Sequence, residues 1–281
     1  MPPLPVPPFQ IIAPPPGAPA TPLVFGSPHS GDVYPDDMGA RRDLPPASLR
    51  SAEDALVDRL VAAGPAHGAP LIHARLGRAY VDLNRAEDEL DPLLIDGVAA
   101  TAGPKVQAGY GVLPRLTGDG VPLYDRWLTG AEAEARLDAV HRPYHAALAD
   151  LMVAAHTRYG RAVLIDWHSM PARAAGWRGG PDVVLGDRHG SSCTAELTRM
   201  LRNAFERRGW RVALNRPYAG GYATRIWGRP AEGFHAIQIE LNRALYFDET
   251  TQVRGRGWDR AQAVVTQIVA DLTAAQTSAQ V

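Results

Sequence analysis

The chain has one cysteine, almost no net charge and no long apolar run. Because Cys193 is the only cysteine, an intramolecular disulfide and a metal site built on paired cysteines are both excluded. The net charge of −1 provides no overall field that would attract nucleic acid or an anionic membrane. No stretch reaches the roughly 18 apolar residues that a membrane-spanning helix needs. These absences predict a soluble, cytoplasmic protein with no nucleic-acid or membrane partner, and they leave its oligomeric state open.

The first 22 residues contain ten prolines and no charged side chain. A signal peptide needs a basic start and a helical apolar core, and this segment has neither. Proline cannot occupy a helix interior or the centre of a sheet. The sequence therefore predicts an extended Pro-rich arm over residues 1–22 and a single domain over residues 23–281.

Apolar, strand-like segments alternate with amphipathic segments along the rest of the chain. Strands are predicted over residues 23–29, 69–76, 80–83, 162–166, 211–214 and 236–241. Helices are predicted over residues 45–64, 129–159, 194–208 and 259–274, and a long loop over 91–123. This alternation is typical of an α/β fold with a central mixed, mostly parallel sheet flanked by helices.

Two of the predicted helices carry local signals. Thr129 followed by Glu132 matches a capping box, and Pro143 is expected to divide or kink the helix that follows. In the helix over residues 45–64, Ser51 is the candidate N-cap. Glu53 and Asp54 then fall in its first turn.

Three polar residues lie at the ends of apolar strands, namely His29, His168 and Glu240. In open α/β sheets, ligands bind beyond the carboxyl ends of the strands. Two histidines and an acid from separate strands suit a catalytic zinc ion, which takes three protein ligands and leaves one position for water. Asp166 precedes His168 by two residues, so it points to the same side and could orient the imidazole.

The residues leave the third metal ligand and the role of Glu240 open. Asp32 lies three residues after His29 and could close on the same metal, whereas Asp54 and Glu53 are the other candidates. A carboxylate such as Glu240 is costly at the end of an apolar strand. Either a cation such as Arg243 neutralises it, or it acts on a metal-bound water.

His141 and His145 are four residues apart and can share one helix face. Without an H-E-x-x-H pattern, and with Pro143 between them, they are predicted to pack or hydrogen-bond rather than to bind zinc.

Two further segments are suited to an anionic substrate. In Asn84-Arg85, the guanidinium offers a fork that matches a carboxylate and the amide adds a neutral hydrogen bond. A salt bridge to the acidic residues 87–89 is the structural alternative. The glycine-containing segment 215–222 and Arg225 carry phenols and guanidiniums, which suit either a mobile substrate lid or a tight turn between strands.

At these residues the chain resembles the N-formylglutamate amidohydrolase family, which belongs to the wider zinc carboxypeptidase and aspartoacylase-like group. The matching segments occur in the expected order and cover roughly residues 23 to 250. They are Ser27–Gly31 with Tyr34-Pro35, Ser51–Asp58, Asp82–Arg85, Arg142–His145, Asp166–Met170, Pro181–Asp187, Asn215–Tyr222 and Gln238–Arg243.

The resemblance implies one zinc ion per chain and hydrolysis of a C–N amide bond. His29 and His168 match the family's metal-binding histidines, and Glu240 matches the general base and acid of the wider group. Asn84-Arg85 resembles the carboxylate-binding pair, to which Tyr222 and Arg225 are added as candidates. Arg78 resembles the arginine that polarises the scissile carbonyl.

The chain departs from the wider group at one position. That group has a glutamate three residues after the first histidine, but Asp32 stands there. The acid of the Ser51–Asp54 motif then becomes the better third ligand. We therefore expect the metal on His29, Asp54 and His168, with Asp32 as the alternative.

The expected reaction is hydrolysis of N-formyl-L-glutamate or a related N-acyl amino acid to a small acid and the free amino acid. The alternative enzyme is a zinc peptidase or amidase that acts on a peptide or a cell-wall fragment. A non-catalytic binding protein is the third possibility. The sequence leaves open the acyl group, the amino acid and the metal used in the cell.

Overall fold

The computed structural model describes residues 4–99, 103–176 and 179–278. Its strands are β1 (Phe9–Ile12), β2 (Leu23–Ser27), β3 (Leu71–Ala74), β4 (Ala162–Met170), β5 (Val183–Gly186), β6 (Val212–Leu214), β7 (Phe234–Asn242), β8 (Phe247–Asp248) and β9 (Val253–Arg254). Its α-helices are α1 (Pro46–Leu49), α2 (Val57–Leu60), α3 (Pro104–Gln107), α4 (Gly130–Arg136), α5 (Arg142–Tyr159), α6 (Ala195–Glu206), α7 (Tyr222–Trp227) and α8 (Trp258–Ser278). A π-helical turn, Leu137–His141, joins α4 to α5.

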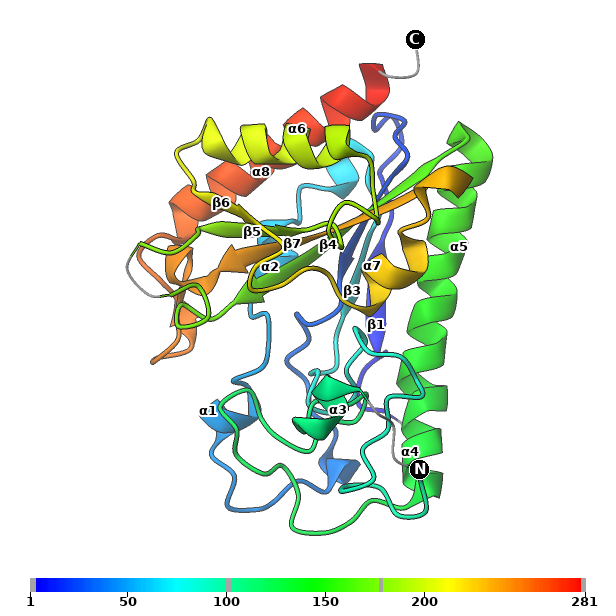
Figure 1. Ribbon diagram of the computed structural model, residues 1–281, viewed down its shortest axis with the longest axis vertical. Coiled ribbons are helices and arrows are strands. Elements are labelled where there is room, and N and C mark those ends of the chain that lie inside the picture. Colours follow the sequence, from blue (N-terminus) through cyan, green and yellow to red (C-terminus); the bar gives the residue numbers. More distant parts are fainter. Residues whose placement is uncertain (1–3, 100–102, 177–178, 279–281) are drawn as a thin grey trace. The chain divides into compact units, whose positions relative to one another are not determined.

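Seven strands form the main sheet, in the order β1-β3-β2-β4-β7-β5-β6. The pairs β2–β4, β4–β7 and β5–β6 are parallel, and β5–β7 is antiparallel. Helix α6 packs against α8 and against β5 and β6, while α7 contacts β4 and β7 (Figure 1). The sheet is therefore mixed, mostly parallel and flanked by helices, as the sequence predicts.

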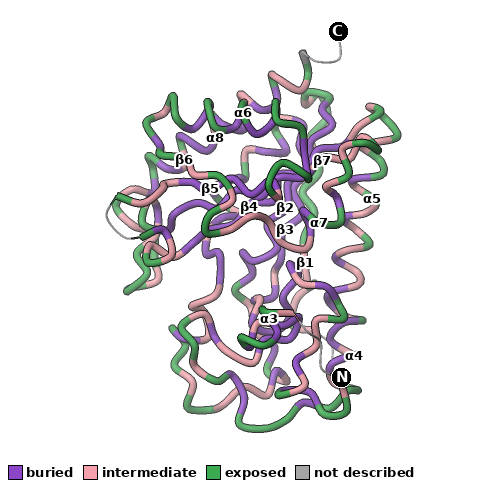
Figure 2. Tube along the Cα trace, in the orientation of Figure 1, coloured by how far each residue is buried: buried purple, intermediate pink, exposed green. Residues whose placement is uncertain are grey.

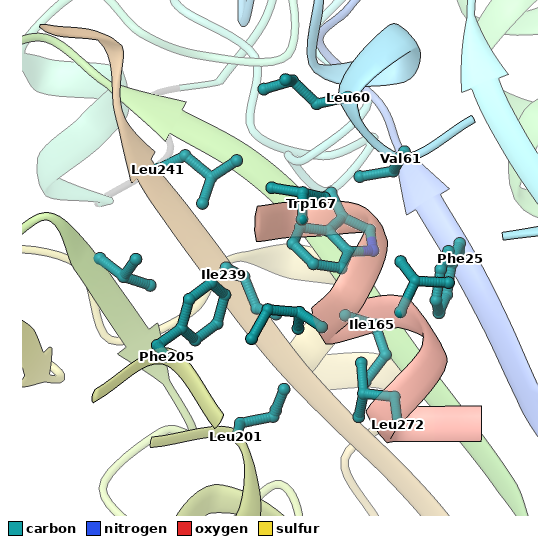
Figure 3. Packing of buried hydrophobic residues seen from close by; sticks show 14 of the residues in the cluster. Phe25, Leu60, Val61, Ile165, Trp167, Leu201, Phe205, Ile239, Leu241 and Leu272 are labelled. Atoms are coloured by element: carbon teal, nitrogen blue, oxygen red, sulfur yellow. The ribbon is translucent and has the colours of Figure 1, made fainter. Parts of the chain in front are cut away.

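The central strands β4 and β7 are buried almost along their whole length (Figure 2). Because successive side chains of a strand point to opposite faces, each strand has two distinct sets of residues. One face is apolar and packs against the helices α2, α6 and α8. Its side chains come together in one core cluster, which includes Phe25, Leu60, Val61, Ile165, Trp167, Leu201, Phe205, Ile239, Leu241 and Leu272 (Figure 3).

The chain divides into two compact units. The first comprises Pro28–Asp54 and His73–Leu148, with the segment that ends at Gln10. The second comprises Ile11–Ser27, Ala55–Ile72 and the chain from Ala149 onward. Strands β2, β4, β5, β6 and β7 belong to the second unit. The predicted division into an arm and a single domain stays a prediction.

A buried guanidinium lies inside the first unit. Arg136 donates from Nη1 to the hydroxyl of Tyr124 at 2.9 Å and from Nη2 to the carbonyl of Met38 at 2.7 Å. Its guanidinium also lies 4.6 Å from the centre of the Tyr80 ring. Neutral acceptors and an aromatic face thus replace the water that this cation loses on burial.

The predicted helix over residues 129–159 is confirmed, including its start. The amide of Glu132 donates to Thr129 Oγ1 at 3.1 Å, and the amide of Thr129 donates to Glu132 Oε2 at 2.9 Å. These two bonds form the capping box. The regular α-helical pattern is interrupted by the π-helical turn immediately before Pro143, which is where a proline was expected to divide the helix.

The predicted helix over residues 45–64 is wrong in its middle part. Only α1 and α2 are helical there, and the intervening segment follows an irregular path. The amide of Asp54 donates to the carbonyl of His29 at 2.9 Å instead of continuing a helix. Leu56 has a left-handed backbone (φ 65°), which ends any helical path at that residue.

The second incorrect prediction is a strand over residues 80–83. That segment forms turns, because Tyr80 donates its amide to the carbonyl of Gly77, and Asp82 donates its amide to that of Val112. Strand β5 carried no strand prediction. In the Pro-rich segment, β1 lies at the edge of the sheet, a position that tolerates neighbouring prolines.

None of the described helices combines the length and the apolar character needed to cross a bilayer. The predicted cytoplasmic location stays a prediction.

We expect Leu201→Ala to lower the free energy of unfolding by about 2–5 kcal/mol, because Leu201 is fully buried in the core cluster and its loss leaves a cavity. The matched control is Leu93→Ala, since Leu93 is 63% exposed. Urea denaturation followed by far-UV circular dichroism measures both variants. Equal loss of stability in the two variants would contradict this assignment of the core.

Candidate functional site

The face of β4 and β7 opposite the apolar core carries polar side chains. Asp166 pairs in register with Gln238, and His168 with Glu240. All four side chains are buried. Alternation along the two strands places them side by side on one face, because Ile165, Trp167, Ile237, Ile239 and Leu241 occupy the other. The sheet thus has one apolar face, which packs in the core, and an opposite face, which carries the polar and ionisable side chains.

Glu240 is held by a neighbouring amide. Gln238 Nε2 donates to Glu240 Oε1 at 2.6 Å, and Gln238 Oε1 accepts the amide hydrogen of Gly221 at 2.8 Å. Gly221 immediately precedes α7. Sequence reasoning assigned no role to Gln238. Gln238 precedes Glu240 by two residues on a strand, and this spacing could have predicted that the two side chains lie on the same face.

Arg243, the cation considered as a neutralising partner for Glu240, contacts Ser169 and Glu249. Its Nε donates to Ser169 Oγ at 3.0 Å, and its Nη1 lies 3.7 Å from Glu249. The buried guanidinium therefore links the end of β4 to the residue that follows β8.

His168 has a carboxylate neighbour on its own strand. Its Nε2 lies 3.0 Å from Asp166 Oδ2, and both side chains are buried. The predicted pairing across one intervening residue is confirmed. A carboxylate on one nitrogen of an imidazole fixes the ring and leaves the other nitrogen as the ligand atom.

His29 and Asp54 meet inside the first unit. Their backbones are joined by the bond from the Asp54 amide to the His29 carbonyl, and Asp54 Oδ2 lies 3.4 Å from His29 Nδ1. Both side chains are buried. Asp54 therefore lies beside this histidine, which the irregular segment between α1 and α2 makes possible.

Gly31 lets the His29 loop approach its neighbour closely. A Cβ atom at this position would lie 2.1 Å from the carbonyl oxygen of Leu76. Any larger residue would push the two segments apart. The close approach of the His29 loop to Leu76 therefore requires a glycine at position 31.

Asp82 is the second residue whose contacts sequence reasoning missed. Its Oδ1 accepts from His29 Nε2 at 2.7 Å and from the amide of Asn84 at 2.9 Å, and its Oδ2 accepts from Arg78 Nη2 at 2.6 Å. Burial by itself would raise the pKa of Asp82, but the positive charge of Arg78 and the contact with His29 hold that pKa well below its usual range. Asp82 is thus ionised and keeps the His29 proton on Nε2.

The other two candidates for the third ligand lie elsewhere. Glu53 is bound by Arg50 at 3.0 Å and accepts the hydroxyl of Tyr34 at 2.8 Å. Burial raises the pKa of Glu53, although both of these partners oppose that shift. Asp32 is exposed.

His29, Asp54 and His168 form a buried group that could hold a metal ion. Each offers one ligand atom, and these atoms all lie within 4.8 Å of one another. The contacts of Asp82 and Asp166 are made to Nε2 of the two rings, and His29 Nδ1 lies 3.4 Å from Asp54 Oδ2, so this nitrogen faces the candidate metal position. Two imidazoles and a carboxylate make up the donor set that Zn²⁺ prefers in catalytic sites.

Asn84 and Arg85 form the loop that follows Asp82. Arg85 donates from Nε to the carbonyl of Tyr110 at 2.9 Å and from Nη1 to the carbonyl of Asn84 at 2.9 Å. In the acidic segment that follows, Glu87 is paired with Arg142. The guanidinium of Arg85 is thus oriented by two neutral carbonyls.

His141 and His145 hydrogen-bond to this same loop. His141 Nε2 lies 2.8 Å from the carbonyl oxygen of Arg85, and His145 Nε2 lies 3.0 Å from that of Leu83. The predicted hydrogen bonding of the two histidines is confirmed, and the expectation that they do not bind zinc stays a prediction. Burial and the neighbouring His141 lower the pKa of His145 to about 3.

The remaining predicted substrate residues lie on α7 in the second unit. Tyr222 is its first residue, and the guanidinium of Arg225 lies 5.2 Å from the Tyr222 ring centre. The preceding loop is anchored by Asn215, whose amide group exchanges hydrogen bonds with the side chain and backbone of Asp187 at 2.8 and 3.1 Å. The loop is therefore tied at both ends, by Asn215 and by Gly221.

The mixed α/β sheet thus comes with a buried His-Asp-His group that could hold a metal ion and a buried glutamate in register with one of its histidines, an arrangement compatible with a metal-dependent hydrolase. The family model of N-formylglutamate amidohydrolase matches residues 21–247. The chain belongs to this family and hydrolyses an amide bond.

Relatives with assigned names agree with this membership. N-formylglutamate deformylase of Pseudomonas putida is 32% identical over 236 residues, which cover 82% of this chain and 83% of the relative. The deformylase of Pseudomonas aeruginosa strain PAO1 is 30% identical over 260 residues, or 90% and 93% of the two chains. The crystal structure of an N-formylglutamate amidohydrolase from Ralstonia eutropha JMP134 is 36% identical, covers 98% of this chain and 100% of its own, and superposes with a TM-score of 0.91. These agreements extend over nearly the whole chain.

Proposed function

We propose that the protein is a zinc-dependent hydrolase that cleaves N-formyl-L-glutamate, or a related N-acyl amino acid, into formate or another small acid and the free amino acid. The observation that carries this proposal is the buried His29-Asp54-His168 group in a chain whose relatives are N-formylglutamate deformylases. The metal ligands, the catalytic residues and the substrate contacts below are parts of the same proposal.

His29, Asp54 and His168 would hold the metal. A bound Zn²⁺ supplies Lewis acidity, which lowers the pKa of water towards about 7 and polarises a carbonyl. Asp82 and Asp166 support the two imidazoles from their Nε2 sides. Such outer carboxylates fix the ring orientation and raise the basicity of the ligand nitrogen.

Glu240 is the proposed general base and acid. It would take a proton from the attacking water and return it to the nitrogen of the leaving amino acid. The bond from Gln238 Nε2 restrains the carboxylate and fixes its orientation for this transfer. Its register position opposite His168 favours this role, because the proton must move close to the metal.

Arg78 is the proposed partner of the oxyanion that develops on the amide carbonyl. Its Nη2 is fixed on Asp82, and its side chain keeps 21% of its surface exposed. Its Nη1 also donates to the carbonyl of Ala52 at 3.4 Å, and an arginine that is already oriented costs little to order when the substrate arrives.

Asn84, Arg85, Tyr222 and Arg225 are the proposed contacts of the substrate's carboxylates. A guanidinium binds a carboxylate through two parallel hydrogen bonds, which also fixes the direction of the bound molecule. Orientation of the scissile amide then follows from the charged end of the substrate.

The direct test of the substrate is a panel assayed by release of amine. We expect N-formyl-L-glutamate to be hydrolysed at least tenfold more efficiently, by kcat/KM, than N-formyl-L-glutamine, because the second lacks the charge that a guanidinium binds. Short peptides serve as the comparison. Faster cleavage of a peptide than of either N-formyl compound would favour the zinc peptidase instead.

Glu240→Gln should lower kcat by about 10²–10⁴-fold while the zinc content stays at that of the wild type, because the amide keeps the shape but cannot accept the proton. Steady-state kinetics and metal analysis measure the two effects. The control is Glu232→Gln, an exposed glutamate paired with Arg229. Near-wild-type turnover in Glu240→Gln would remove the glutamate from the mechanism.

Asp54→Ala should reduce bound zinc below half an equivalent and should not be rescued by added zinc, because the site then keeps only two protein ligands. Asp32→Ala and Glu53→Ala are the matched controls, and both should retain about one equivalent. Metal analysis after dialysis measures the zinc bound per chain in each variant. Zinc loss in Asp32→Ala with retention in Asp54→Ala would reassign the third ligand. A wild-type protein that binds no zinc would favour a non-catalytic binding function.

A further inference from the structure

Two neighbouring histidines, whose rings are tilted by 45° to each other, contact the Asn84-Arg85 loop. His141 ends the π-helical turn and His145 lies in the first turn of α5, and their ring centres are 4.4 Å apart. The spacing of four residues presents both rings on one side of the helix. A π-helical turn shifts the residues that follow it, which makes it a common device for aiming side chains at functional sites.

Each ring binds one carbonyl of the loop. His145 Nε2 donates to Leu83 O and His141 Nε2 donates to Arg85 O, at 3.0 and 2.8 Å. Because a carbonyl can only accept, both rings carry a proton on Nε2. The Leu83 carbonyl belongs to the peptide unit before Asn84 and the Arg85 carbonyl to the one after Arg85, so the two bonds hold the chain on both sides of the Asn84-Arg85 pair.

The opposite side of the loop is fixed by Asp82. The amide of Asn84 donates to Asp82 Oδ1, and the amide of Arg85 donates to the Asp82 carbonyl. The loop is therefore held by a carboxylate at its start and by two imidazoles along its carbonyls. Few free torsions remain for the two residues that would contact the substrate.

The charge state of the pair suits this arrangement. Burial lowers the pKa of both histidines, that of His145 to about 3. At neutral pH the pair adds no charge beside Arg85. The positive charge that a carboxylate would meet there belongs to the guanidinium alone.

We infer that His141 and His145 are positioning residues that hold the Asn84-Arg85 backbone in the geometry needed to bind the substrate's carboxylate. This inference rests on the proposed function for its kinetic consequence, because only a carboxylate substrate would depend on Asn84 and Arg85. Its structural part, the restraint of the loop, is independent of the substrate.

The first test is kinetic. We expect His145→Leu and His141→Leu each to raise KM for N-formyl-L-glutamate about tenfold with kcat changed less than threefold, because a buried carbonyl loses its donor and the loop moves. His145→Gln should show only a small part of this increase in KM, since a glutamine amide can reach the same carbonyl. Zinc content should stay at the wild-type value throughout.

The matched control is on the same helix. His156 Nε2 donates to the carbonyl of Glu232 at 3.0 Å, so His156→Leu removes a bond of the same kind away from the loop. We expect its KM and kcat to match those of the wild type. A KM increase equal to that of His145→Leu would assign the effect to general destabilisation and overturn the inference.

The second test needs no turnover. Hydrogen–deuterium exchange of the peptide covering residues 83–86 should be at least tenfold faster in His145→Leu than in the wild type and unchanged in His156→Leu. Unchanged exchange in His145→Leu overturns the inference whatever the substrate is. Absence of N-formyl-L-glutamate hydrolysis by the wild type would refute the proposed function. The exchange experiment would still show whether His145 restrains the loop.

Should the leucine variants not fold, His145→Gln is compared with His145→Asn, whose amide is too short to reach Leu83 O. A higher KM and faster exchange in His145→Asn support the inference. Equal values in these two variants overturn it.

Discussion

A single buried carboxylate, Asp82, joins three parts of the proposed chemistry. It accepts from His29 on one oxygen, from Arg78 on the other, and from the amide of Asn84. An uncompensated charge at such depth would destabilise the fold by several kcal/mol, so these donors are also what makes the burial of Asp82 possible. Displacement of this one group would therefore disturb a metal ligand, the candidate oxyanion partner and the substrate loop together.

The second constraint is the alternation of side chains along β4 and β7. Apolar residues fill the core under α6 and α8, while Asp166, His168, Gln238 and Glu240 share the opposite face. A shift of the register by one residue would exchange these faces, burying charge in the core and placing leucine and isoleucine at the site. The large apolar core thus fixes the alignment of His168 with Glu240, and stability and chemistry depend on the same pairing.

Local signals in the sequence predicted much of the fold. The capping box at Thr129, the amphipathic helix that became α6 and the apolar run before His168 depend on neighbours a few residues away, so they appear in the structure as expected. The segment around Asp54 does not, because its path is set by the His29 carbonyl and by the left-handed backbone of Leu56. Helical propensity there is weaker than these constraints, and the strand-like pattern of residues 80–83 is likewise overridden by the bonds of Tyr80 to Gly77 and of Asp82 to Val112.

The sequence by itself determined which chemical groups the chain carries and that His29, His168 and Glu240 lie on or next to apolar strands. Only the tertiary structure decided which candidate carboxylate lies beside His29, since Asp32 is three residues away in the chain and exposed, whereas Asp54 is 25 residues away and lies 3.4 Å from the ring. Likewise, the partnership of Asp82 with His29 spans 53 residues. Such pairings carry no periodic signal, because they arise from the packing of distant segments rather than from the preferences of any one of them.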